Sequence, residues 1–425
     1  MFFSLDVLPA RKGDCLMLHY GTEDKPRLML IDGGPADVYT PHLKPRLEMI
    51  RTARTLDDGK PLPVEVVMVT HIDDDHINGI LELTEEQRQN APGLRLKVSS
   101  LWFNSLDDLL STDEVVAGRN ATSSVLAGMD DDALGDIDIE NEDQHQTVEV
   151  LSSIPQGRTL RDDAEFLNWN PNHKFGGKLI MAVGAAGPVD LGPLQVTVVG
   201  PMQPELLALQ KAHDKWLKDH EEGKETTPEA MLAAFVDKSV PNLSSIVVLV
   251  EAEGKKMLLT GDARGDKILK GLELVGVIKN GGELHVDILK VPHHGSSNNM
   301  ATTFFARVTA DHYVFSGNGE HGNPERETLE MLLEARDEDE DFTIHLTYPI
   351  DEIDEARKAD WKKEQAKEQK RKERGSDKPV RPNWSPAKNG LVAFFKAHPK
   401  FEGKVVVVED ETPHLIHLGD EFELE

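Results

Sequence analysis

The chain has 425 residues and a formal net charge of −29, and 39% of its residues are apolar. This length can bury a sizeable core in one large or two ordinary domains, and the composition suits a soluble globular enzyme. The strong negative charge excludes a surface that coats nucleic acid over its whole area but allows a local basic patch.

The sequence carries no sign of a disulfide framework, a signal peptide or a membrane span. The single cysteine, Cys15, excludes an internal disulfide framework. The amino terminus lacks the basic and apolar regions of a signal peptide, and no run approaches the roughly 18 apolar residues that span a bilayer. We therefore expect a cytoplasmic protein without membrane association.

Short apolar runs recur along the chain, and each ends in polar or glycine residues, as strands that present a site at their ends do. Helical spacing appears between several of them. This alternation predicts a layered α/β protein with functional residues at one edge of its sheets. The predicted strands are 28–31, 64–69, 194–199, 246–250, 257–260, 286–291 and 312–315, and the predicted helices are 76–83, 205–220, 228–237 and 327–335.

Two segments have a biased composition. Residues 107–143 are acidic and loosely patterned, which indicates an insertion. Residues 357–388 are basic, with twelve Lys or Arg against five acidic residues. The basic segment is either a solvated helix with i,i+4 charge pairs or a surface that contacts a phosphate backbone. In the second case the contacts would come from Lys362, Lys363, Lys370, Arg371 and Lys372.

The stretch 70–79 places four candidate metal ligands within six positions, directly after the predicted strand 64–69. Imidazole and carboxylate groups are ligands that zinc and manganese accept, and a sharp turn after a strand aims several of them at one point. The spacing HxDxDH therefore predicts a divalent metal site. Its residues are His71, Asp73, Asp75 and His76.

Further candidate residues also follow apolar runs: Asp32, Asp262 and the pair His293-His294. In this order, together with the HxDxDH cluster, they resemble the metallo-β-lactamase superfamily. Asp73 in place of the usual second histidine, and LKVPHHGS at 289–296, resemble the β-lactamase-like domain of the ComEC/Rec2 competence-protein group. The resemblance covers most of residues 1–350 and does not include a membrane channel.

The resemblance implies an α/β fold, the αββα metallo-β-lactamase sandwich, with a metal site where the two sheets meet. Residues 1–350 would form the catalytic domain, with the acidic insertion at about 107–143. Residues 351–390 would form a basic helical or loop segment, and residues 391–425 would return as strands that pack on the catalytic domain.

The resemblance also implies roles for the ligands. His71 and Asp73 would hold a first ion and Asp75 and His76 a second, with Asp262 as the carboxylate that bridges them.

The two adjacent histidines receive different expected roles. His294 is the expected last ligand of the second ion, and His293 is expected to face the substrate as an acid, although the two could exchange roles. Asp32 is expected to orient the ligands from behind.

One ligand of the superfamily is missing. Other members supply a third histidine to the first ion from the strand before the bridging aspartate, but here the predicted strand 194–199 ends in Gly200-Pro201. His173 and His213 lie in the interval, although neither is at a strand end. Fewer nitrogen donors favour manganese or magnesium over zinc relative to other members. We expect one or two divalent ions, with manganese or zinc first and magnesium as a further candidate, and the first ion weakly held.

The predicted chemistry is hydrolysis by a metal-activated water. Asp75 would orient this water, and His293 and His321 would stabilise charge or protonate the leaving group, whereas Lys290 is expected to point away. The favoured function is a phosphodiesterase or nuclease that acts on DNA or RNA, with small phosphodiesters as a related substrate class. The alternatives are hydrolysis of an ester, lactone or thioester, and a non-catalytic metal-binding subunit.

Overall fold

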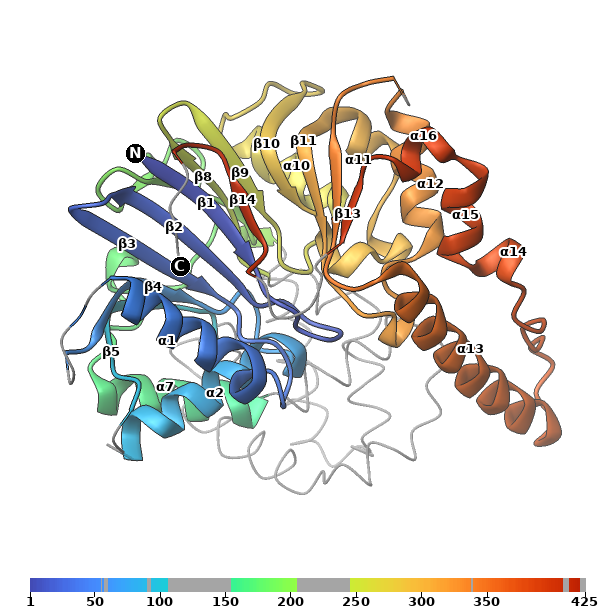
Figure 1. Cartoon of the computed structure of the whole chain (residues 1–425), viewed down its shortest axis with the longest axis horizontal. Coiled ribbons are helices and arrows are strands. Elements are labelled where there is room, and N and C mark those ends of the chain that lie inside the picture. Colours follow the sequence, from blue (N-terminus) through green and yellow to red (C-terminus); the bar gives the residue numbers. More distant parts are fainter. Residues whose placement is uncertain are drawn as a thin grey trace, which may run out of the picture.

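The computed structural model describes residues 1–54, 56, 60–89, 93–105, 154–204, 245–337, 339–407 and 413–420. Its strands form two sheets of six and eight strands that lie face to face, with helices on both outer sides (Figure 1). The αββα layering expected from the sequence is therefore confirmed.

The first sheet combines an antiparallel meander at its start with two parallel strands. Helices α1 (Lys44–Ala53), α2 (Asp74–Gln89) and α7 (Ile154–Leu167) cover its outer face, and a short π-helix, η1 (Tyr39–Leu43), precedes α1. In the order of the sheet, the strands are β14 (Leu415–His417), β1 (Phe2–Val7), β2 (Leu16–Thr22), β3 (Lys25–Ile31), β4 (Leu62–Met68) and β5 (Leu96–Trp102).

The second sheet is parallel from β9 to β13 and antiparallel from β6 to β9. In the order of the sheet, its strands are β13 (Val405–Val407), β12 (Thr343–Leu346), β11 (Val308–Phe315), β10 (Leu284–Lys290), β9 (Lys255–Leu259), β8 (Val247–Ala252), β7 (Gln195–Gly200) and β6 (Val189–Asp190). The helices of this half are α10 (Gly265–Leu274), α11 (Thr302–Arg307), α12 (Arg326–Ala335), α13 (Ile350–Glu373), α14 (Pro386–Asn389), α15 (Leu391–Ala397) and α16 (Pro399–Glu402).

Apolar side chains pack in three layers. One buried cluster fills the space between the sheets and includes Leu5, Leu18, Val248 and Leu259. The other two clusters join each sheet to its own helices. Strands that are buried on both faces read as continuous apolar runs, which is why their positions could be predicted from the sequence. Within the described residues, no helix has both the length and the apolar character needed to cross a membrane.

The predicted strands coincide with β3, β4, β7, β8, β9, β10 and β11, and the predicted helices 76–83 and 327–335 lie inside α2 and α12. The acidic insertion at 107–143 and the predicted helices 205–220 and 228–237 lie outside the described residues. The domain limits at 350 and 390 stay predictions.

The expectation that residues 391–425 form strands is wrong for the first part of this segment, which forms α15 and α16. Leu391, Phe394 and Phe395 of α15 follow the spacing of one helical side, and with Phe401 of α16 they are buried in the cluster beneath the second sheet. In the described part of this segment, strands are found at β13 and β14, which pair with β12 and β1, one in each sheet.

Candidate metal centre

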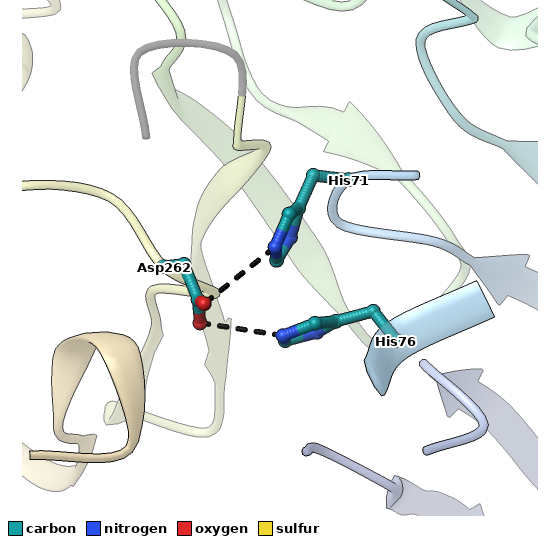
Figure 2. A group of neighbouring side chains, drawn as sticks. All are labelled: His71, His76 and Asp262. Carbon is teal, nitrogen blue, oxygen red and sulfur yellow. Dashed lines mark ion pairs between the residues drawn. The ribbon is translucent and has the colours of Figure 1, made fainter. Parts of the chain in front are cut away.

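The predicted ligands lie where strands of both sheets end. Asp32 follows β3 and His71 follows β4, while Asp262 follows β9 and His293 follows β10. Both strand pairs are parallel, so their carboxyl ends meet at one edge of each sheet, where sites of α/β proteins lie. Figure 2 shows the result: His71 and His76 from the first sheet point toward Asp262 from the second.

The turn that carries His71 and His76 is held by close backbone contacts. The His76 carbonyl accepts a hydrogen bond from Gly33 N–H at 2.8 Å, and Gly34 accepts one from Gly79 N–H at 3.0 Å. A Cβ atom on Gly79 would lie 2.0 Å from the Gly33 carbonyl oxygen, so only glycine fits there. These contacts fix the first turn of α2 against the loop after β3.

The two carboxylate oxygens of Asp262 face different histidines. Oδ2 lies 3.6 Å from Nε2 of His71 and 3.6 Å from Nε2 of His293. Oδ1 lies 3.4 Å from Nε2 of His76 and 3.4 Å from Nε2 of His294. Asp262 therefore separates two sets of imidazole nitrogens, one on each side.

The aspartates of the HxDxDH cluster divide in the same way. Oδ2 of Asp73 lies 3.5 Å from Nε2 of His71, on the Oδ2 side of Asp262. Asp75 lies on the other side, 3.8 Å from Nε2 of His76 and 3.7 Å from Nε2 of His294. The Asp75 side chain is 15% exposed, against 7% for Asp73, so Asp75 is nearer to solvent.

Each of the four histidines has a polar partner at Nδ1, and its Nε2 faces Asp262. Partners that accept a hydrogen bond from Nδ1 orient metal-binding imidazoles and raise their basicity, whereas the Asn299 amide nitrogen donates to Nδ1 of His293. The partners are Thr70 Oγ1 for His71 (3.1 Å), Asp32 Oδ2 for His76 (2.9 Å), the Asn299 amide for His293 (2.5 Å) and Ser316 Oγ for His294 (2.9 Å).

Asp32 acts through its neighbours. Its Oδ1 accepts a hydrogen bond from Thr70 N–H and its Oδ2 accepts one from the Thr70 hydroxyl, both at 2.7 Å. Because the Thr70 hydroxyl donates to Asp32, it accepts from Nδ1–H of His71, so the lone pair of His71 lies on Nε2. Asp32 is fully buried behind the histidines and orients both of them.

The pair His293-His294 has an unusual backbone. Both residues are in the left-handed region, with φ of 49° and 53°. Non-glycine residues rarely adopt this conformation, and it is concentrated at functional sites. Two consecutive left-handed residues turn both rings toward the same carboxylate, although neighbours in a strand would point apart.

The residues fit one or two divalent ions. Buried polar atoms that make no hydrogen bond cost about 1–3 kcal/mol each, and five of them gather here. Two ligands that each lie about 2.1 Å from a tetrahedral ion are about 3.4 Å apart, close to the nitrogen–oxygen distances around Asp262. The five atoms are Nε2 of His71, His76 and His294, Oδ1 of Asp73 and Oδ1 of Asp262.

The crowding of acids and imidazoles shifts their pKa values strongly. Burial raises the pKa of Asp73 to about 7 and lowers the pKa of His293 to about 4. Burial would also lower the pKa of His294, but Asp262 and Asp14 raise it to about 9. Despite its burial, Asp262 has a pKa well below the ordinary value because four imidazoles surround it.

Asp14 and Lys290 are part of the centre, and the expectation that Lys290 points away is wrong. Lys290 is fully buried, and its Nζ lies 2.7 Å from Oδ2 of Asp14. Ile288 packs in the cluster between the sheets, but Leu284 and Val286, which have the same parity, pack in the cluster beneath the helices. The alternation of β10 therefore does not predict the orientation of Lys290, and Asp14 had only its position in Gly13-Asp14-Cys15.

Other predicted residues lie elsewhere. His321 is exposed on the short helix η6 (Glu320–Gly322) and is not among the converging residues of the described chain. His173, on η2 (His173–Phe175), interacts with Ser100 Oγ at 3.0 Å instead. His213 lies outside the described residues. Of the residues predicted to contact a phosphate backbone, Lys362, Lys363, Lys370 and Lys372 are exposed on α13 and Arg371 is half-buried.

Comparisons with known proteins give distant likenesses, and no protein-family model matches the sequence. The chain is 39% identical over 77 residues to the microtubule-associated protein futsch of Drosophila melanogaster, which is 17% of this chain and 1% of that protein. It is 40% identical over 58 residues to human microtubule-associated protein 1A, which is 13% of this chain and 2% of that protein. The chain thus spans only a small part of the curated relatives it matches.

Two solved structures are similar to this chain at low identity and low TM-score. A Parabacteroides distasonis protein, provisionally described as a metal-dependent hydrolase, is 10% identical with a TM-score of 0.33, over 80% of this chain and 92% of that one. Zn²⁺-bound PqqB from Methylobacterium extorquens is 11% identical with a TM-score of 0.23, over 72% of this chain and 60% of that one. The resemblance to the ComEC/Rec2 group stays a prediction, and the assignment of a function depends on the geometry of the centre.

Proposed function

We propose that this chain is a metal-dependent hydrolase that cleaves phosphodiester bonds, with a divalent ion on each side of Asp262. The observation that carries the proposal is the division of the ligands by the two oxygens of Asp262. On the Oδ2 side the ligands are His71, Asp73 and His293, and on the Oδ1 side they are Asp75, His76 and His294.

His293 in this scheme replaces the missing third histidine. Its Nε2 lies as far from Oδ2 of Asp262 as that of His71 does, at 3.6 Å. Each side then offers two imidazoles and two carboxylates, a donor set that suits manganese or zinc. Binding through Nε2 places the proton of His293 on Nδ1, so the Asn299 amide must present its oxygen, and not its nitrogen, to that atom. A nitrogen committed to an ion cannot also donate a proton to a leaving group, so in this scheme His293 is a ligand and not the acid.

Divalent ions held in this way activate water as a nucleophile and offset the negative charge of a phosphoryl group. Asp75 is the ligand carboxylate nearest to solvent, with a side chain 15% exposed against 5% for Asp262. It can therefore accept a hydrogen bond from the attacking water and direct it at the substrate. Asp262 is enclosed by four imidazoles and holds the two halves of the centre together.

The positive charge of a centre with two divalent ions favours a phosphodiester as the substrate. A centre with two divalent ions presents concentrated positive charge to an anionic ester, whereas a neutral ester, lactone or thioester gains less from it. The exposed basic residues of α13 would in addition suit a polymer with a phosphate backbone. DNA and RNA are therefore the first substrates to offer.

The test uses metal-stripped protein that is reloaded with Mn²⁺, Zn²⁺ or Mg²⁺. It is offered bis-p-nitrophenyl phosphate, single- and double-stranded DNA, RNA, and p-nitrophenyl acetate with a simple lactone as the ester arm. Asp262→Ala is the site variant. Asp287→Asn is the matched control, because Asp287 is a buried aspartate on β10 that pairs with Lys255 away from the centre.

We expect metal-dependent phosphodiester cleavage by the wild type and by Asp287→Asn, and none by Asp262→Ala. Cleavage of the ester or lactone alone would replace the proposal with the carboxylic-ester alternative. Uptake of metal without hydrolysis of any substrate would indicate a non-catalytic metal-binding subunit. Equal cleavage by Asp262→Ala and the wild type would show that the centre does not take part in the reaction.

A further inference from the structure

We propose that Asp14 and Lys290 form a positioning pair that fixes His294 toward Asp262 and makes the Oδ1 side the tighter of two metal sites. This inference rests on the proposed function because it assumes that divalent ions bind on both sides of Asp262.

Asp14 reaches both residues at once. It lies in the loop between β1 and β2 of the first sheet, and its Oδ2 lies 2.7 Å from Nζ of Lys290, the last residue of β10 in the second sheet. Its Oδ1 lies 3.2 Å from Nδ1 of His294. The pair therefore joins the two sheets directly behind a ligand.

Ser316, which follows β11, completes the arrangement. Its hydroxyl donates to Oδ1 of Asp14 at 2.5 Å and lies 2.9 Å from Nδ1 of His294. Because this hydroxyl donates to Asp14, it is an acceptor for Nδ1–H of His294. The imidazole lone pair then lies on Nε2, toward Asp262.

The burial of both charged side chains indicates that the Asp14–Lys290 pair has a role at the metal centre. Lys290 and Asp14 are 0% and 1% exposed. Removing two charges from water costs about as much as their attraction returns, so apolar residues of similar volume would stabilise the fold at least as well. An ion pair that adds little to stability but contacts a ligand is best explained by orientation of that ligand.

Lys290 also balances charge at the centre. Five carboxylates surround it, and two divalent ions would offset four of their negative charges. The Lys290 ammonium group would offset the fifth. The five carboxylates are Asp14, Asp32, Asp73, Asp75 and Asp262.

The two sides of Asp262 differ in the partners of their histidines. On the Oδ1 side both imidazoles have a carboxylate oxygen within 3.2 Å of Nδ1, from Asp32 for His76 and, beside the Ser316 hydroxyl, from Asp14 for His294. On the Oδ2 side the partners of His71 and His293 are a neutral hydroxyl and a neutral amide. A carboxylate partner makes imidazole a stronger ligand, so the Oδ1 side should bind its ion more tightly.

The experiment is a calorimetric titration of metal-stripped protein with Mn²⁺ and with Zn²⁺. The variants are Asp14→Asn, Lys290→Met and Ser316→Ala. The matched control is Asp6→Asn, because Asp6 is a buried aspartate that pairs with Arg46 at 2.6 Å and His19 at 3.3 Å, which are not among the residues that face Asp262. Circular dichroism and urea unfolding report whether each variant is folded.

We expect two classes of site in the wild type. Asp14→Asn should lose 10–100-fold in affinity at the tighter class and little at the weaker class, as changes of a ligand's partner do. Lys290→Met and Ser316→Ala should weaken the same class by less, and Asp6→Asn should leave both classes unchanged. If Asp14→Asn does not fold, the test uses Ser316→Ala instead. This change removes the hydroxyl that bridges Asp14 and His294, but it leaves the charge of Lys290 paired with Asp14.

The positioning role is overturned if folded Asp14→Asn, or Ser316→Ala in its place, keeps wild-type affinity at the tighter class, or if Asp6→Asn loses as much. In that event, a wild type that binds metal and cleaves phosphodiesters would still support the proposed function. A wild type that takes up no divalent ion would overturn both proposals.

Discussion

Gly13 lies so close to Asp75 that a Cβ atom on Gly13 would be 1.8 Å from the Asp75 carbonyl oxygen. The neighbouring Asp14 N–H also donates to this oxygen, at 3.3 Å. The loop after β1 is thus packed against the first turn of α2, which carries Asp75 and His76.

We predict that Gly13→Ala separates the two segments. The free energy of unfolding should fall by about 1–3 kcal/mol, as for other overpacked positions. Metal affinity should fall at least about tenfold because Asp75 and His76 are displaced. Urea unfolding and a Mn²⁺ titration measure the two effects.

Gly187→Ala is the control for this change, because a Cβ atom at Gly187 meets nothing within 4 Å and its φ is not positive. It should match the wild type in both measurements. Wild-type metal affinity in Gly13→Ala would show that the contact does not position the ligands.

Asp32→Asn should weaken metal binding without removing a ligand. Three donors, two from Thr70 and one from His76, converge on the two oxygens of Asp32, and an asparagine offers one oxygen and no charge. The expected loss is 10–100-fold in metal affinity. Asp37→Asn is a suitable control, since Asp37 also has a positive φ but is exposed. Equal affinities for Asp32→Asn and the wild type would contradict the orienting role.

The strands and the metal turn could be predicted because each signal is local. An apolar run such as 64–69 indicates a strand, and ligands directly after it must lie at the strand end. Residues 391–402 were misread because short apolar runs fit a strand or a helix equally well, and only packing against the second sheet decides between them.

Contacts between the two sheets could not be predicted in this way. Asp14 and Lys290 are 276 positions apart in the sequence, and no spacing rule joins them. The placement of His293 beside His71 depends on left-handed backbone conformations at His293 and His294. Such conformations are rare for residues other than glycine, so the sequence does not predict them. The pairing of Asp73 and Asp75 with opposite sides of Asp262 was expected from the resemblance to the metallo-β-lactamase superfamily and not from a spacing rule.

A row of three histidines away from the centre makes stability depend on pH. His345, on β12, lies 3.0 Å from the ring of His312 and 2.9 Å from the ring of His414. Burial, with the two neighbouring rings, lowers the pKa of His345 to about 3. Between the unfolded value of 6.5 and this pKa, the unfolded chain binds a proton that the folded chain does not, so stability is lost as the pH falls below 6.5.

We predict that His345→Gln removes this dependence. From pH 7.5 to 5.5 the free energy of unfolding of the wild type should fall by about 1.4 kcal/mol more than that of the variant. Urea unfolding at the two pH values measures the difference. His285→Gln, which changes an exposed ring, should behave as the wild type does. An equal fall in all three proteins would place the acid sensitivity elsewhere.

The basic residues of α13 offer a test of polymer binding that leaves the metal centre untouched. In Figure 1 this helix extends away from the sheets, and it packs against η6 and α15. Trp361 holds the following segment on one side of α13, where its indole N–H donates to the Pro382 carbonyl at 2.8 Å. Lys362, Lys363 and most of the other lysines are left exposed.

We predict that changing Lys362, Lys363, Lys370 and Lys372 together to glutamine lowers cleavage of DNA or RNA and leaves cleavage of bis-p-nitrophenyl phosphate unchanged. The dependence of polymer binding on salt should also become shallower, by about 0.7–0.9 in the logarithmic slope for each phosphate contact that is lost. The matched control changes the exposed Lys25, Lys97, Lys174 and Lys279 in the same way. An equal effect of the control would mean that only net charge matters, and no effect of either set would mean that α13 is a solvated helix whose charges serve its own solubility.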